Sequence, residues 1–359
     1  MFNFPSKFQG FNNNNKKRKI LQLFRATDFE SLMYPCFTFC RILGIFPYKI
    51  NASTIKIYKP CYILSAIITC IFCVIELKTL YDMNSSKNTA FKSILTILER
   101  DCFHIFGGTI IVLTFILTGP RMRLLQTILE ISLRLPQESY QNLSRLIHTK
   151  DVFLFFSIVI QASIYYHTMQ LSIFRKILLL YIILLVFQMD MLYINCVCVL
   201  KACFKQINDN LANMQELVVH DEPYLIRETF HEQRNSFLLT KLKALKKQHL
   251  AISDTVKILN MNFGFQLRCT IIISFTIVTI HLFFFLLRMH ESASVDNLRK
   301  VYYNNSIIIV VYHITKLVLI VWACETGKNQ AMEVNTTVHN VLNSTNDQQI
   351  KYEVDLKKL

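Results

Sequence analysis

Two charged side chains lie within otherwise apolar stretches of the sequence. Asp190 separates the uncharged runs 177–189 and 191–200, and Lys316 separates the runs 301–315 and 317–324. A charge in an apolar surrounding is costly, so such residues pair with each other or line a water-filled cavity. The sequence leaves both interpretations open: an ion pair that fixes helix packing, or a polar floor beneath a binding site.

A second group of aromatic and hydrogen-bonding side chains lies in the halves of the apolar stretches that the charge distribution, described below, assigns to the outside. Such groups suit a pocket for a small organic ligand. For Tyr165, Tyr166 and Tyr181 taken singly, an aromatic belt at the membrane surface is the favoured interpretation. The ligand-binding hypothesis comprises His104, Tyr165, Tyr166, His281, Tyr312 and His313, with Asp190 and Lys316 below them; Glu76, Gln161, His167 and Tyr181 lie at similar depth.

Nothing in the sequence predicts an enzyme. There is no G-x-S-x-G, no P-loop and no H-E-x-x-H pattern. The chain has 11 cysteines, but the pairs Cys70/Cys73 and Cys196/Cys198 have no histidine nearby in sequence. We therefore expect reduced structural thiols, no metal site and no cofactor.

The elements that must position these side chains are membrane-spanning helices. The chain is 52% hydrophobic and only 18% charged, and a helix needs about 20 mostly apolar residues to cross a bilayer. Soluble proteins and β-barrels are disfavoured because the segments are apolar on all sides. Six spans are expected, at 61–75 with its flanks, 102–120, 152–174, 177–200, 269–287 and 301–324.

The distribution of Lys and Arg predicts the orientation of the chain. If the N-terminus is cytosolic, the cytosolic segments hold 29 Lys and Arg and the outer segments hold 9. Positive residues are retained on the cytosolic side, which also explains the net charge of +15 without nucleic acid as a partner. Asn84 and Asn304 are then outer glycosylation sequons, whereas Asn142 and Asn335 belong to cytosolic ones.

The predicted organisation has four parts. Residues 1–24 are a disordered basic N-terminus that contacts the lipid bilayer at most, and 25–56 are an interfacial segment broken by Pro35 and Pro47. Residues 57–324 form the six-span domain. Within it, the cytosolic loop 201–268 should contain a long helix that continues into the fifth span, with Phe237, Leu238, Leu242, Leu245 and Leu250 on one side. Residues 325–359 form a cytosolic helical tail.

Two segments of the chain resemble insect gustatory receptors, particularly the hymenopteran kind. They are "ATDFESLMYPCFTFCRILGIFPY" near the N-terminus and "CETGKNQAMEVNTTVHNVL" after the sixth span. The resemblance implies an all-α, seven-span protein with a cytosolic N-terminus in the plasma membrane of a sensory neuron. It also implies a homo- or heterotetrameric, ligand-gated cation channel that detects small-molecule tastants.

The resemblance also implies a seventh span that lines the pore, with a Thr-Tyr…Gln-Phe signature. The sequence has six recognisable spans and reaches Leu359 where that helix would begin. The expectation is therefore that these 359 residues alone do not conduct.

Three other classes of membrane protein compete with this reading. An odorant receptor of the same superfamily is the nearest alternative. A secondary transporter would show repeats or spans broken by glycine and proline, and the chain has only 7 of each. A G-protein-coupled receptor would have an outer N-terminus, which the charge distribution opposes.

Overall fold

The computed structural model describes residues 25–51, 54–85, 94–168, 172–219, 228–290 and 297–344. Within these ranges the chain forms eight helices and one two-stranded sheet. Helices α3 (Lys59–Ser85), α7 (Ile173–Val219), α8 (Glu228–His290) and α9 (Asn297–Ser344) each contain a stretch long and apolar enough to cross a membrane. The expected class, an all-α polytopic membrane protein, is confirmed.

A fifth candidate span is bent. Helices α4 (Ile94–Ile116) and α5 (Thr118–Ser132) meet at Leu117 at an angle of 67°. The sixth expected span, 152–174, is not among these candidates in the described part of the chain: it covers the second half of α6 (Gln137–Thr168), and its last two residues already belong to α7.

Arg121 on α5 stabilises this bend from the inside. Its guanidinium is buried and donates to the Gln266 side chain on α8 at 2.7 Å and to the Asn262 carbonyl at 3.2 Å. It also lies over the Phe263 ring, 4.4 Å from the centroid. A buried charge requires such compensation, so the bend and the middle of α8 are held together.

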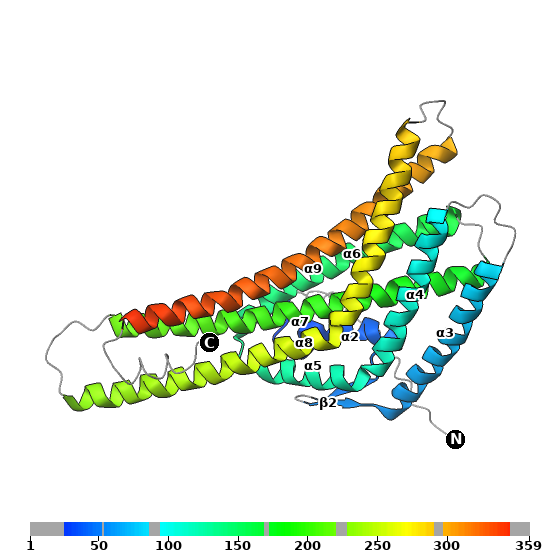
Figure 1. Ribbon diagram of the computed structural model, residues 1–359. Helices are drawn as coiled ribbons and strands as arrows, with labels where there is room; N and C mark the ends of the chain where they lie inside the picture. The colour runs from blue at the N-terminus through cyan, green and yellow to red at the C-terminus, as the bar shows by residue number, and fades with distance from the viewer. Residues whose placement is uncertain are drawn as a thin grey trace, which may run out of the picture.

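Helix α7 is the centre of the bundle. Of its most apolar stretch, 67% of residues are buried inside the protein, against 17% for α3 and 33% for α8 and α9. Residues of α3 that face outward are therefore available to lipid, whereas α7 is covered by other helices. Figure 1 shows α7 running through the molecule between α9 and α8, with α3 and α4 at one end.

Helices α7, α8 and α9 extend together beyond their apolar stretches (Figure 1). Asn208 on α7 donates to Glu333 on α9 at 2.9 Å, and the Phe204 ring lies 5.4 Å from that of His249 on α8. The prediction that the long loop helix runs continuously into the fifth span is confirmed, because α8 is one helix from Glu228 to His290.

The predicted apolar face of that helix was partly wrong. Leu238, Leu242 and Leu245 are buried, but Phe237 and Leu250 are 62% and 49% exposed. Successive residues on a helix differ by about 100°, so only one of Phe237 and Leu238 can face α7. At the other position the buried neighbour is His249, not Leu250.

The N-terminal part of the described chain is a short helix packed into the protein. Helix α2 (Phe29–Ile42) begins with a capping box between Asp28 and Ser31. It ends at Ile42 with Leu43 as its C-cap, and the φ of 73° at the following Gly44 favours glycine. The amides of Gly44 and Ile45 donate to carbonyls of the last turn, in a Schellman arrangement.

Two sequence expectations for this segment differ from the structure. Helix α2 passes through Pro35 rather than breaking there. Its chain continues into a hairpin, β1 (Tyr48–Asn51) and β2 (Thr54–Ile57), which pair antiparallel and which the all-helical expectation did not include. The Tyr48 hydroxyl is buried and donates to the Thr118 carbonyl at the start of α5; burial raises the pKa of Tyr48 well above its usual value.

Candidate functional site

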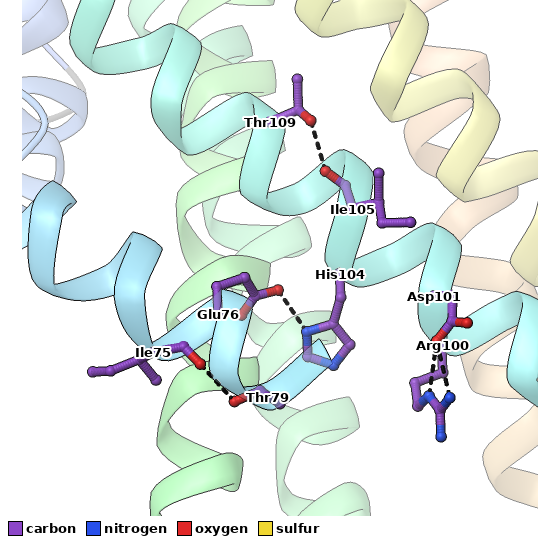
Figure 2. Close-up of polar contacts among 8 residues, drawn as sticks. All are labelled: Ile75, Glu76, Thr79, Arg100, Asp101, His104, Ile105 and Thr109. Atoms are coloured by element: carbon purple, nitrogen blue, oxygen red, sulfur yellow. Dashed lines mark hydrogen bonds and ion pairs between the residues drawn. The ribbon is translucent and has the colours of Figure 1, made fainter. Parts of the chain in front are cut away.

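The candidate site is built first on a contact between α3 and α4. Glu76 lies in the middle of α3, and His104 lies on the facing side of α4 (Figure 2). Nδ1 of His104 donates to Oε1 of Glu76 at 2.7 Å, and both residues are more than 90% buried. This bond fixes the imidazole ring and leaves its Nε2 available for another partner.

A cavity of about 310 Å³ opens beside His104, between α3, α4, α6, α7, α8 and α9. Most of the wall surface is aliphatic or aromatic, although nine of its 18 lining residues are polar or charged. The lining residues are Thr79, Thr96, Glu99, Arg100, Phe103, His104, Gln161, Arg175, Leu178, Leu179, Ile183, Val186, Ile273, Ile277, Ile309, Tyr312, His313 and Lys316. We call it the outer cavity, because it lies toward the ends of the spans that the charge distribution assigns to the outside.

Lys316 forms part of the cavity wall and is also paired. Its Nζ lies 3.5 Å from Oδ2 of Asp190, which is fully buried on α7. The hydroxyl of Thr270 on α8 donates to the other carboxylate oxygen at 3.0 Å. The two sequence interpretations thus combine: the ion pair exists, and its lysine also faces the cavity.

The histidines of α8 and α9 are held by neighbouring side chains. His313 lines the outer cavity and shares a hydrogen bond with Ser274 at 3.1 Å. His281 is not part of the wall. Its Nε2 donates to Glu99 at 3.2 Å, so it positions a residue that does line the cavity.

The structure brings together half of the ligand-binding hypothesis at the cavity wall. His104, Tyr312, His313 and Lys316 line it, as does Gln161 from the wider group. Asp190 and His281 do not line the cavity, but they contact Lys316 and Glu99, which do. The side chains of Tyr165, Tyr166 and His167 lie outside the described residues, and Tyr181 instead donates to the Leu43 carbonyl.

Sequence reasoning missed the charged mouth of the cavity. Glu99, Arg100 and Arg175 line it, and Arg100 is paired with Asp101 at 3.0 Å (Figure 2). Arg175 was expected in the outer segment 169–176, and Glu99 and Arg100 in the outer segment 77–101, because the apolar run there begins only at Cys102. The helix begins eight residues earlier, at Ile94, and this extension brings Glu99 and Arg100 into the wall.

The proposed glycosylation sites lie near helix ends. The backbone of Asn84 belongs to the last turn of α3, and that of Asn304 to the first turns of α9. Their side chains are outside the described set. Among the described residues, no cluster of His, Cys, Asp and Glu could hold a metal ion.

Comparison with known proteins shows which family and which solved structure this chain is similar to. The family model described as 7tm Chemosensory receptor matches residues 33–356. Among solved structures, the insect olfactory receptor OR5 from Machilis hrabei is similar, with a TM-score of 0.59 over 96% of this chain and 89% of that chain. The two are 11% identical, so the likeness concerns the fold. No curated protein matches the chain.

Proposed function

Since the chain belongs to the 7tm chemosensory receptor family, we propose that it is a gustatory receptor that detects small organic tastants in the outer cavity. In this proposal it is a subunit of a homo- or heterotetrameric, ligand-gated cation channel in the plasma membrane of a sensory neuron. The N-terminal segment 26–48 is what favours taste over smell.

The composition of the outer cavity is the observation that supports this function. Ligand pockets are mostly apolar hollows of about 300–1,000 Å³ with a few fixed polar groups, and this one has about 310 Å³. His104, Gln161, Tyr312 and His313 are all at least 90% buried and line it. Oε1 of Gln161 has no hydrogen-bond partner among the described residues, which suits a ligand that donates a hydrogen bond.

Away from the mouth, where Glu99, Arg100 and Arg175 lie, the cavity favours a neutral ligand. Lys316 is compensated by Asp190 at 3.5 Å, and Arg100 by Asp101 at 3.0 Å. A ligand carrying a full charge would lose its hydration without meeting an uncompensated opposite charge at the floor. We therefore expect a small, largely apolar molecule with one or two hydrogen-bonding groups, such as a phenol or an alcohol.

The test is a ligand response measured in cells that express the complete receptor. Alanine at His104 or His313 should shift the effective concentration of an active compound by about ten-fold, the effect of losing one good contact. The matched control is His339→Ala, because His339 is exposed on the distal part of α9. Surface labelling of every variant reports whether the receptor reaches the plasma membrane.

Unchanged potency for both cavity variants at normal surface expression would reject this site. A response only to volatile compounds would replace the taste assignment by smell and leave the cavity intact. A response without any cation current would reject the channel assignment alone.

A further inference from the structure

The hairpin formed by β1 and β2 has one face against the protein and one face away from it. Lys49 pairs with Lys56 in its register, and Ile50 pairs with Ile55. Successive side chains of a strand point to opposite faces. Tyr48 and Ile55 are buried, whereas Lys49 and Lys56 are exposed. The two lysines therefore lie opposite each other on the outward face of the hairpin.

This arrangement of the two lysines is unfavourable unless an anion lies beside them. Like charges directly opposite each other in an antiparallel pair destabilise it. Neither Lys49 nor Lys56 has an ion-pair partner among the described residues. The sequence from 31 to 75 holds four basic residues and no Asp or Glu. On α5, which packs against β2, Glu130 accepts a hydrogen bond from Gln126 at 2.7 Å and forms no ion pair with either lysine.

The hairpin lies at the base of a helix that faces lipid. The Tyr58 amide donates to the Pro47 carbonyl at 2.8 Å, which joins the hairpin to the start of α3 (Figure 1). The candidate span of α3 begins at Lys59, and only 17% of its most apolar stretch is buried inside the protein. Lys56 precedes Lys59 by three residues, which is at most about 11 Å of extended chain. The lysines of the hairpin are therefore close to the lipid headgroups around the base of α3.

We propose that Lys49, Lys56 and Lys59 bind anionic phospholipid headgroups of the cytosolic leaflet. We call these three exposed residues the lysine face. The charge distribution assigns the start of α3 to the cytosolic side, and the cytosolic leaflet is the one that carries anionic lipid. A headgroup between Lys49 and Lys56 offsets their repulsion. Tyr58, which is 49% exposed, lies next to Lys59, and tyrosine suits the headgroup level of a membrane.

Quenching of tryptophan fluorescence by brominated lipids tests this proposal on the purified full chain in bilayers. Ile63 and Leu77 are residues of α3 that are 59% and 68% exposed. They follow Lys59 by about 6 Å and about 27 Å, so Ile63→Trp is an inner reporter and Leu77→Trp an outer reporter in a core of about 30 Å. The single native tryptophan is removed by Trp322→Phe. Comparing brominated phosphatidylserine with brominated phosphatidylcholine gives the local preference for anionic lipid at each reporter.

We expect phosphatidylserine to be preferred at the inner reporter and not at the outer one. Each lysine near an anionic leaflet contributes roughly a five-fold preference. The variant K49Q/K56Q should therefore lower the preference at the inner reporter by about ten-fold or more. The matched control K205Q/K257Q removes two exposed lysines of α7 and α8, away from the hairpin, and should leave this preference nearly unchanged.

Thermal unfolding gives an independent measurement and shows whether each variant is folded. In phosphatidylcholine alone, K49Q/K56Q should melt at or above the temperature of the native chain, because it removes the repulsion between the two lysines. Phosphatidylserine should raise the melting temperature of the native chain more than that of the variant.

Four outcomes would overturn the proposal. The first is an equal lipid preference of the native chain and K49Q/K56Q at the inner reporter. The second is an equal loss in the control pair, which would indicate a general charge effect. The third is an equal preference at both reporters, because anionic lipid would then not be localised at the base of α3. The fourth is a lower melting temperature of K49Q/K56Q in phosphatidylcholine alone, which would contradict the repulsion.

Discussion

Replacing Asp190 by Asn is expected to lower the free energy of unfolding by about 3–5 kcal/mol, because it strands a buried lysine charge. Asn keeps the shape of the side chain and can still accept the hydrogen bond from Thr270. At 3.5 Å, two unit charges attract by about 5 kcal/mol at an effective dielectric constant of about 20. Lys316 is only 2% exposed, so water reaches it much less readily than it reaches a surface lysine and compensates poorly for the lost partner.

Two further variants separate the energy of the ion pair from the effect of each charged residue alone. Lys316→Met should cost about as much as Asp190→Asn, because it strands the carboxylate. The double variant removes both charges and should lie within about 1–2 kcal/mol of the native chain, since a neutral pair of similar volume needs no compensation. The double-mutant cycle should therefore give a coupling energy of about 3 kcal/mol or more.

The assay is thermal unfolding of the purified chain in detergent, with reversible unfolding by denaturant where it can be reached. A matched cycle at Glu325 and Lys328 is the control, because these residues are 3.9 Å apart but 57% and 65% exposed. Such an exposed pair should show a coupling below about 1 kcal/mol. Additive effects of the Asp190 and Lys316 variants would refute the buried ion pair.

Three further expectations follow from individual residues. Gly107→Ala should lower the melting temperature, because a Cβ there would lie 2.6 Å from Ile182 on α7; overpacking of this kind costs about 1–3 kcal/mol. Asp28→Ala should cost about 1 kcal/mol, since it removes the capping box of α2, and a melting curve measures it. Glycan mapping in cells should find sugar on Asn84 and none on Asn142, as the charge distribution requires.

Each of these has its own control. Gly119→Ala meets nothing within 4 Å and should leave the melting temperature unchanged or slightly higher. Asp28→Asn keeps an acceptor oxygen and should be near neutral. Sugar on Asn142 would reverse the orientation of the whole chain, and with it the assignment of the outer cavity.

The sequence predicted what depends on strong local contrast. Asp190 and Lys316 were identified because a charge within a long apolar run is costly unless it is paired or lines a cavity. The structure pairs them. The long helix of α8 followed from its periodicity. Glu99 was missed because it precedes the apolar run, in a segment whose default interpretation is a solvated loop.

Features that depend on distant partners were harder to foresee. Helix α2 passes through Pro35 because its other face is buried against the bundle, which the local sequence does not show. The β-hairpin had a detectable pattern, since Tyr48-Lys49-Ile50 and Ile55-Lys56-Ile57 alternate. An aromatic belt at the membrane surface and a ligand pocket use the same residue types. Only the fold shows that Gln161 and Tyr312 line the outer cavity and that Tyr181 does not.

The burial of α2 has a consequence for how the protein is made. Gln188 donates to the Cys36 carbonyl across 152 positions of sequence, and the Tyr48 hydroxyl reaches Thr118 across 70. At a synthesis rate of about 5–20 residues per second, the apolar face of α2 leaves the ribosome about 8–30 s before its partner on α7. During that interval α2 lacks its contacts with α7, so the part of its apolar face that α7 covers is exposed. Mutations that slow the synthesis or insertion of α7 should therefore expose the N-terminal segment to degradation, even though the two are far apart in the gene.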